Sequence, residues 1–255
     1  MIELALIGIG TGNPDHLTLQ AVREIGRCDV ILLPLKGDEK SELAEIRRAI
    51  CDRFRSGNAR IAEFVMPVRD EAIPDYRARV EAWHKAIAQK WSEAIAASSA
   101  PSRDADLRVG LLVWGDPSLY DSTMRIAERL GEQLPVRVEI IPGITSLQML
   151  TAVHAIPANE VGQPFMVTTG RQIRDSGFPE QVDTVFVMLD GECSFMHLPP
   201  ADFDIWWGAF LGMPGQVVLS GSLEHTRDRI VAGRALARKR AGWVMDSYML
   251  RRRRN

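Results

Sequence analysis

Three short glycine-containing turns constrain this chain more than any other feature. They span residues 8–12 (GIGTG), 115–120 (GDPSLY) and 142–146 (PGITS), and each follows a strand-like apolar run and precedes a helix-like stretch. A strand that ends at a glycine-rich bend leaves backbone N–H and C=O groups without partners, and glycine lets a ligand approach them closely. The sequence therefore predicts that the three turns form one composite site for a small polar molecule.

The order of the apolar patterns predicts an α/β fold. The expected strands are 2–7, 30–33, 60–65, 108–114, 136–141, 165–169, 184–189, 216–220 and 243–250. The expected helices are 16–27, 41–54, 75–97, 121–130, 145–155, 202–210 and 225–240. A turn at 131–135 predicts a boundary between two domains, 1–131 with a mainly parallel sheet and 132–255 with a mixed sheet.

The composition argues against several classes of protein. The formal net charge is −2, which gives no electrostatic basis for nucleic-acid binding. Three widely spaced cysteines form no C-x-x-C pair, and their odd number argues against a disulfide framework. No uncharged apolar run approaches the ~20 residues that span a bilayer, and we see no signal-peptide pattern or metal-ligand spacing. We therefore expect a cytoplasmic protein without nucleic-acid, membrane or metal partners.

Each turn also has a plainer interpretation. The first turn reads G-x-G-x-G, whereas a dinucleotide site favours G-x-G-x-x-G and an acidic residue at the end of the second strand; Asp29 precedes that strand instead. Asp116, on a bend made rigid by Pro117, can accept a hydrogen bond from a ligand or cap the next helix. Thr145 and Ser146 can likewise cap a helix whose exposed N–H groups attract polar groups.

Four motifs in order give a stronger indication. The runs LIGIGTGNPDHLTL (6–19), GDPSLYDST (115–123), IPGITS (141–146) and VLSGSL (218–223) resemble the signatures of the tetrapyrrole methylase family, and together they cover nearly the whole chain. The resemblance implies a two-domain α/β fold that binds S-adenosylmethionine in a cleft between the domains, and a homodimer. Transferred position by position, it implies cofactor contacts from Thr11, Gly115, Asp116, Leu119, Tyr120, Thr145, Ser146, Met188 and Gly221.

The chain departs from the family pattern at two places. The first loop commonly reads Gly-Pro-Gly-Asp, whereas residues 10–13 here read Gly-Thr-Gly-Asn. Some members carry an acidic residue after the second strand, where this chain has Pro34 and Leu35. The general base of those members is therefore not expected here.

Within the family, the stretches 167–171, 187–192 and 204–215 are most similar to members that methylate carbon 1 of precorrin-5 and release acetate in cobalamin biosynthesis. Acetate release requires a group that activates water or stabilises an oxyanion. The candidates are Arg171 and Glu192, with His154 and His197 as alternatives. Guanidinium groups bind carboxylates in two-point fashion, so we expect Arg171 and Arg174, together with the ammonium of Lys36, to bind the acid groups of the tetrapyrrole. We expect Trp207 to line the cleft that holds it.

Two alternatives remain open from the sequence. One is a related methyltransferase that acts on a different precorrin or cobalt-precorrin of the same pathway. The other, from a different class, is a nucleotide-sensing binding module, which would use the three turns but leaves the chain after Gly170 without a role.

Overall fold

We describe the protein from a computed structural model, which describes residues 1–35, 41–98 and 106–253. The described chain divides into two compact units, residues 1–145 and 146–255. The sequence predicted this boundary between residues 131 and 132. In the structure the boundary lies further along the chain, because strand β5 (Val136–Ile141) pairs in parallel with β1 (Ile2–Gly8) and belongs to the first sheet.

The first unit contains a parallel sheet in the order β3-β2-β4-β1-β5. Its other strands are β2 (Val30–Leu35), β3 (Arg60–Val65) and β4 (Leu107–Val113). Strand β1 has apolar residues at every position from Leu4 to Ile7, as expected for a strand buried on both faces. The predicted parallel sheet is confirmed.

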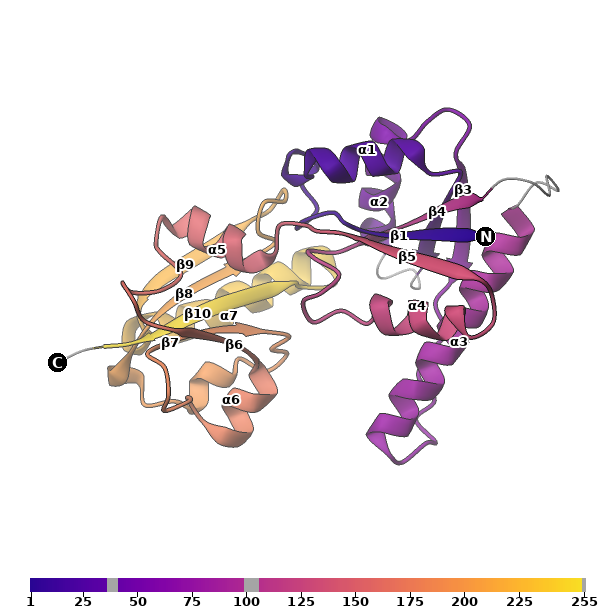
Figure 1. The fold of residues 1–255 in the computed structure, drawn as a ribbon. Coiled ribbons are helices and arrows are strands. Elements are labelled where there is room, and N and C mark those ends of the chain that lie inside the picture. Colours follow the sequence, from indigo (N-terminus) through magenta and orange to yellow (C-terminus); the bar gives the residue numbers. More distant parts are fainter. Residues whose placement is uncertain (36–40, 99–105, 254–255) are drawn as a thin grey trace. The chain divides into compact units, whose positions relative to one another are not determined.

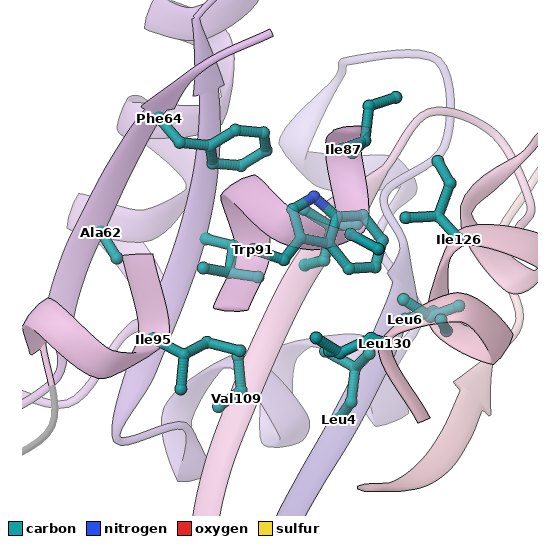
Figure 2. Close-up of a cluster of buried hydrophobic side chains, with 14 of the residues drawn as sticks. Leu4, Leu6, Ala62, Phe64, Ile87, Trp91, Ile95, Val109, Ile126 and Leu130 are labelled. Atoms are coloured by element: carbon teal, nitrogen blue, oxygen red, sulfur yellow. The ribbon is translucent and has the colours of Figure 1, made fainter. Parts of the chain in front are cut away.

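Helices cover both faces of this sheet, as Figure 1 shows. Alternate strand residues, including Ala5 and Ile7, pack with α1 (Leu19–Arg27) and α2 (Ser41–Phe54). The opposite set, including Leu4 and Leu6, packs with α3 (Tyr76–Ser98) and α4 (Thr123–Gly131). In Figure 2, Trp91 of α3 lies at the centre of this second cluster. The aromatic residues of α3 thus form core, as their helical spacing predicts.

The second unit contains a mixed sheet in the order β6-β7-β10-β8-β9. Its strands are β6 (Phe165–Thr169), β7 (Thr184–Met188), β8 (Phe203–Ala209), β9 (Val217–Ser222) and β10 (Asp246–Arg252). Strands β6 and β7 are parallel, and the remaining pairs are antiparallel, which confirms the predicted mixed sheet. Its helices are α5 (Ser146–His154), α6 (Gly170–Ser176) and α7 (Leu223–Ala241); α6 was not predicted.

The helix predicted over 202–210 is wrong. The segment forms β8, and its residues alternate between a face that includes the buried Trp207 and a face on which Trp206 packs with α5. The sheet is covered on both faces, so apolar residues at consecutive positions are compatible with a strand.

Candidate functional site

The three glycine turns meet at one place in the first unit. We call the segments Gly8–Gly10, Gly115–Asp116 and Gly143–Thr145 the turn junction. Gly10 and Gly115 form an isolated antiparallel bridge, in which the Gly115 amide donates to the Gly10 carbonyl at 2.7 Å and the Gly10 amide to the Gly115 carbonyl at 3.3 Å. The predicted convergence of the turns is therefore present within this unit.

Close backbone contact explains why glycines stand at the turn junction. A Cβ atom added to Gly143 would lie 2.1 Å from the carbonyl oxygen of Gly115, and one added to Gly8 would lie 2.6 Å from the amide nitrogen of Gly143. Gly10 and Gly115 have φ values of +70° and +63°, which side chains other than glycine rarely adopt. Both the contact and the backbone conformation thus require glycine here.

Asp116 links the second turn to the third. Its Oδ2 atom accepts a hydrogen bond from the Gly143 amide at 2.9 Å, and its Oδ1 atom accepts one from the Ser118 amide at 2.8 Å. Partial burial raises the pKa of this carboxyl, but the hydrogen bonds from Ser118 and Gly143 outweigh it and hold the pKa below its ordinary value. Asp116 is therefore an ionised brace of the turn junction at neutral pH.

The third turn leads into α5 with a buried hydroxyl that lacks a partner. Ser146, the first residue of α5, has its Oγ atom buried without a hydrogen-bond partner in the described structure. Thr145 is buried beside it. A buried polar atom without a partner is unusual and points to a missing ligand or water. Ser146 is therefore the clearest structural sign of a small-molecule site.

The other predicted contacts of the first unit lie next to the turn junction in sequence. Thr11 is half-buried, and its hydroxyl lies 3.5 Å from Nδ1 of His16. The Leu119 amide donates to the Asp116 carbonyl, and Tyr120 is exposed with φ of 49°. A tyrosine in this left-handed region is strained and often marks a functional loop. Lys36 lies outside the described residues.

In the second unit, two of the charged candidates form an ion pair at its surface. Arg171 and Arg174 are exposed on α6, and Glu192 follows β7. Arg174 pairs with Glu192 at 2.5 Å between Nη1 and Oε2. The structure thus brings a predicted substrate-binding residue together with a predicted catalytic one. Met188 is half-buried at the end of β7, and Gly221 is exposed on β9 with φ of +145°.

Trp207 does not fit its predicted role. Its side chain is 0% exposed, and its Nε1 atom donates to Oδ2 of Asp246 at 2.8 Å. The expectation that Trp207 lines a substrate cleft is therefore not supported, because both faces of its ring and its donor are used inside the second unit. Of the alternative residues, His154 contacts the Trp207 carbonyl oxygen through Nε2 at 3.1 Å, and His197 is exposed.

Sequence reasoning missed the support of the loop that carries Glu192. Asp190 is buried and accepts hydrogen bonds from the Ser194 amide at 2.6 Å and from the Tyr248 hydroxyl at 2.7 Å. A Cβ atom on Gly170 would lie 2.3 Å from Cγ of Asp190, so the start of α6 packs directly on this network. The run Val187–Glu192 contains no periodic pattern that would predict such contacts from sequence.

Two classes of site find no support in the described part of the chain. No group of three or more histidine, cysteine, aspartate or glutamate side chains is arranged there to hold a metal ion. Among the helices formed by the described residues, none combines the length and apolar character needed to cross a membrane.

Comparison with known proteins agrees with the motifs. Residues 3–226 match the family model of tetrapyrrole (corrin/porphyrin) methylases. The chain is 44% identical over 255 residues to a Sinorhizobium protein named precorrin-6A synthase (deacetylating), with 99% of this chain and 96% of the relative covered. It is also 31% identical over 157 residues to a precorrin-2 C(20)-methyltransferase of Sinorhizobium, with 60% and 58% covered.

Solved structures show the same fold. A Corynebacterium diphtheriae protein described as related to cobalamin synthesis (CobF) superposes with a TM-score of 0.81 at 34% identity, covering 98% of this chain and 99% of that one. A uroporphyrin-III C-methyltransferase from Thermus thermophilus, solved in complex with S-adenosyl homocysteine, gives a TM-score of 0.56 at 18% identity, covering 97% and 96%. The second likeness supports the fold alone.

Proposed function

Because this chain belongs to the tetrapyrrole (corrin/porphyrin) methylase family, we propose that it transfers a methyl group from S-adenosylmethionine to carbon 1 of precorrin-5 and releases acetate, giving precorrin-6A. The observation that carries this proposal is the 44% identity, along 99% of the chain, to a protein named precorrin-6A synthase (deacetylating). Two other relatives are named as methyltransferases of carbon 20 and match shorter parts of the chain, 157 and 184 residues.

The turn junction suits the binding of S-adenosylmethionine. When bound, this group supplies a methyl on a sulfonium sulfur, whose neutral thioether leaves without acid catalysis. The described turns present backbone groups and the hydroxyls of Thr145 and Ser146 rather than competing nucleophiles. Their task is to hold donor and acceptor carbon about 3–3.5 Å apart and to exclude water. Contacts from Met188 and Gly221, in the second unit, stay a prediction.

The deacetylation step requires residues that act on water. Water attacks the acetyl carbonyl carbon, the bond from that carbon to the ring breaks, and acetate leaves. The electron pair left on the ring carbon then forms the bond to the methyl group as the bond from methyl to sulfur breaks. Glu192 is the proposed acceptor of the water proton, and Arg171 the proposed group that stabilises the oxyanion or binds a substrate carboxylate. Arg174, which pairs with Glu192, would orient the Glu192 carboxylate.

The test uses the purified full-length chain with precorrin-5 and S-adenosylmethionine carrying a labelled methyl group. The proposal expects one labelled methyl and one acetate per product molecule. Methyl transfer without acetate would assign the chain to a sister methylase instead. Binding of S-adenosylmethionine without any transfer would favour the sensing module, and calorimetry with NAD provides the negative control.

The family resemblance also supports two proposals about the state of the protein, a homodimer and a cytoplasmic location. Light scattering on the purified chain tests the first, since a monomeric mass at micromolar concentration contradicts it. Fractionation of cells tests the second. The proposed partner is a tetrapyrrole, and nothing in the net charge of −2 favours nucleic acid.

A further inference from the structure

A cavity lies in the first unit, at the carboxyl ends of several of its strands. We call it the aromatic cavity: it has a volume of about 150 Å³ and is lined by residues of β2, β3, β4, α2, α3, α4 and the segment between β4 and α4. Trp114, one of its lining residues, directly precedes Gly115 of the turn junction. In α/β proteins this edge of the sheet is the usual place for ligands.

The walls of the aromatic cavity are largely apolar, yet they hold an indole donor without a partner. Trp91 is 1% exposed, and its Nε1 atom has no hydrogen-bond partner in the described structure. Figure 2 shows this nitrogen on the side of the ring that faces Phe64 and Ile87, both of which line the cavity. A buried N–H without an acceptor is costly, so its position toward a cavity suggests that a ligand supplies the acceptor.

Two further donors line the same cavity. The Nε1 atom of Trp114 is also buried without a described partner. Arg47 lies with its guanidinium carbon 5.1 Å from the centre of the Trp114 ring. Its Nε atom donates to the Leu112 carbonyl at 3.1 Å and its Nη1 atom to the Leu43 carbonyl at 3.3 Å. Among the described residues, none forms a hydrogen bond with the Nη2 atom of Arg47.

Among the described residues no carboxylate forms an ion pair with Arg47 at 4 Å or less, although the charge of Asp121 acts on its guanidinium from a greater distance. Burial lowers the pKa of its guanidinium to about 10, which leaves it a cation at neutral pH. The carboxylate of Asp121 also lines the cavity, but its Oδ1 atom accepts from the amide of Thr123 at 2.6 Å and from its hydroxyl. The cavity therefore offers a cation and two N–H donors within apolar walls.

We propose that the aromatic cavity binds the carboxylate of a short-chain acid, acetate or propionate in size. The carboxylate oxygens would accept from Arg47, Trp91 and Trp114, and the methyl or methylene groups would lie against Phe64 and Ile87. A water molecule would satisfy the indole donors but would not give Arg47 an anion within hydrogen-bond distance. A short carboxylate would supply an acceptor to the indole donors and an anion to Arg47.

Two sources offer this chemistry, and the assignment between them rests on the proposed function. One is an acetate or propionate side chain of the tetrapyrrole. The other is the acetate set free in deacetylation. Carboxylate binding in the aromatic cavity is tested without tetrapyrrole or S-adenosylmethionine. A failure of this binding can therefore be distinguished from a failure of the proposed function.

The first experiment titrates sodium acetate and sodium propionate into the full-length protein labelled with ¹⁵N at its tryptophan indoles. W91F and W114F each delete one indole N–H signal and thereby assign it. We expect saturable shifts in these two signals with a dissociation constant on the order of 1 mM, given the few atoms of the ligand. Absence of saturation, or shifts confined to other indole signals, overturns the proposal.

Substitutions then test the donors. R47M is expected to weaken acetate binding about 10- to 100-fold, because it removes a charge-assisted hydrogen bond. R48M is the matched control: Arg48 follows in the same helix, pairs with Glu63 at 2.6 Å and does not line the cavity. Equal binding by R47M and the wild type overturns the proposal. If R47M fails to fold, W91F and W114F, which keep an aromatic ring, must each weaken binding instead.

Turnover kinetics distinguish the two sources. If the cavity takes a substrate side chain, R47M raises KM for precorrin-5 and added acetate competes with it. If it takes the released acetate, R47M leaves that KM unchanged and abolishes inhibition by acetate. A protein in which acetate moves the two indole signals but R47M changes neither kinetic property would not use the cavity in this reaction, which overturns the link to the proposed function.

Discussion

At Gly143, one added methyl group tests the turn junction. G143A places a Cβ atom 2.1 Å from the Gly115 carbonyl oxygen, which forces the second and third turns apart. We expect this variant to bind S-adenosylmethionine at least about 10-fold more weakly, measured by calorimetry. The matched control is G131A at the end of α4, where an added Cβ atom meets nothing within 4 Å. Equal binding by both variants would contradict a cofactor role for the turn junction.

Asp116 gives the turn junction a pH dependence of known sign. Its pKa is lowered in the folded state, so its contribution to stability is complete above the unfolded pKa of about 3.9 and is lost as the pH falls through the lower folded value. The free energy of unfolding of D116N at pH 7 is expected to be about 1 kcal/mol lower than that of the wild type, because charged acceptors form stronger hydrogen bonds. Urea denaturation of both proteins should show this difference shrinking below about pH 4. A constant difference across that range would contradict the brace.

Single residues show how far the sequence alone could reach. The glycines and Asp116 were predictable because each turn follows its strand directly, and parallel strands end at one edge of a sheet. Arg47 was not: its side chain leaves α2 and lies over Trp114 of the segment after β4, 67 positions later, and no local pattern encodes that contact. The predicted core role of Trp91 is confirmed, but its unpartnered nitrogen depends on neighbours from several elements.

At the scale of the element, strand β8 offers a test of the corrected role of Trp207. W207F keeps an aromatic ring in the core but removes the hydrogen bond to Asp246. We expect a loss of stability of about 1.5–3 kcal/mol, since the acceptor is a buried carboxylate, and an unchanged KM for precorrin-5. Thermal unfolding and turnover kinetics measure the two effects. A raised KM with unchanged stability would restore Trp207 as a substrate contact.

Strands were harder to predict where both faces of the sheet are covered. In β8, Phe203, Ile205 and Trp207 are buried on one face, which is the period of two expected for a strand. Trp206 packs on the opposite face and obscures that alternation, so the segment resembles a helix in sequence. The location of β5 was predicted, but its sheet was not, because pairing with β1 joins residues more than 130 positions apart.

At the scale of the whole molecule, an ion cluster in the first unit allows a test of whether the two units unfold separately. Arg108 donates to Glu24, Glu139 and Glu3 at 2.5, 2.5 and 2.8 Å, near the amino ends of strands in the first unit. These hydrogen bonds raise the pKa of Arg108, although burial opposes them. Glu24 is only 4% exposed, so removal of its partner would leave a buried charge.

R108M should therefore destabilise the first unit by about 3–5 kcal/mol, the usual effect of breaking a buried ion pair. Hydrogen exchange is the suitable measurement, because a chain with two compact units need not unfold in one step. We expect faster exchange in β1, β4 and β5, with β7, β8 and β10 unaffected. R137M, which removes an exposed arginine 3.6 Å from Glu3, is the control and should change little. Equal loss of protection in both sheets would mean that the units unfold together, and the turn junction, built wholly within residues 1–145, would then depend on the second unit for its stability.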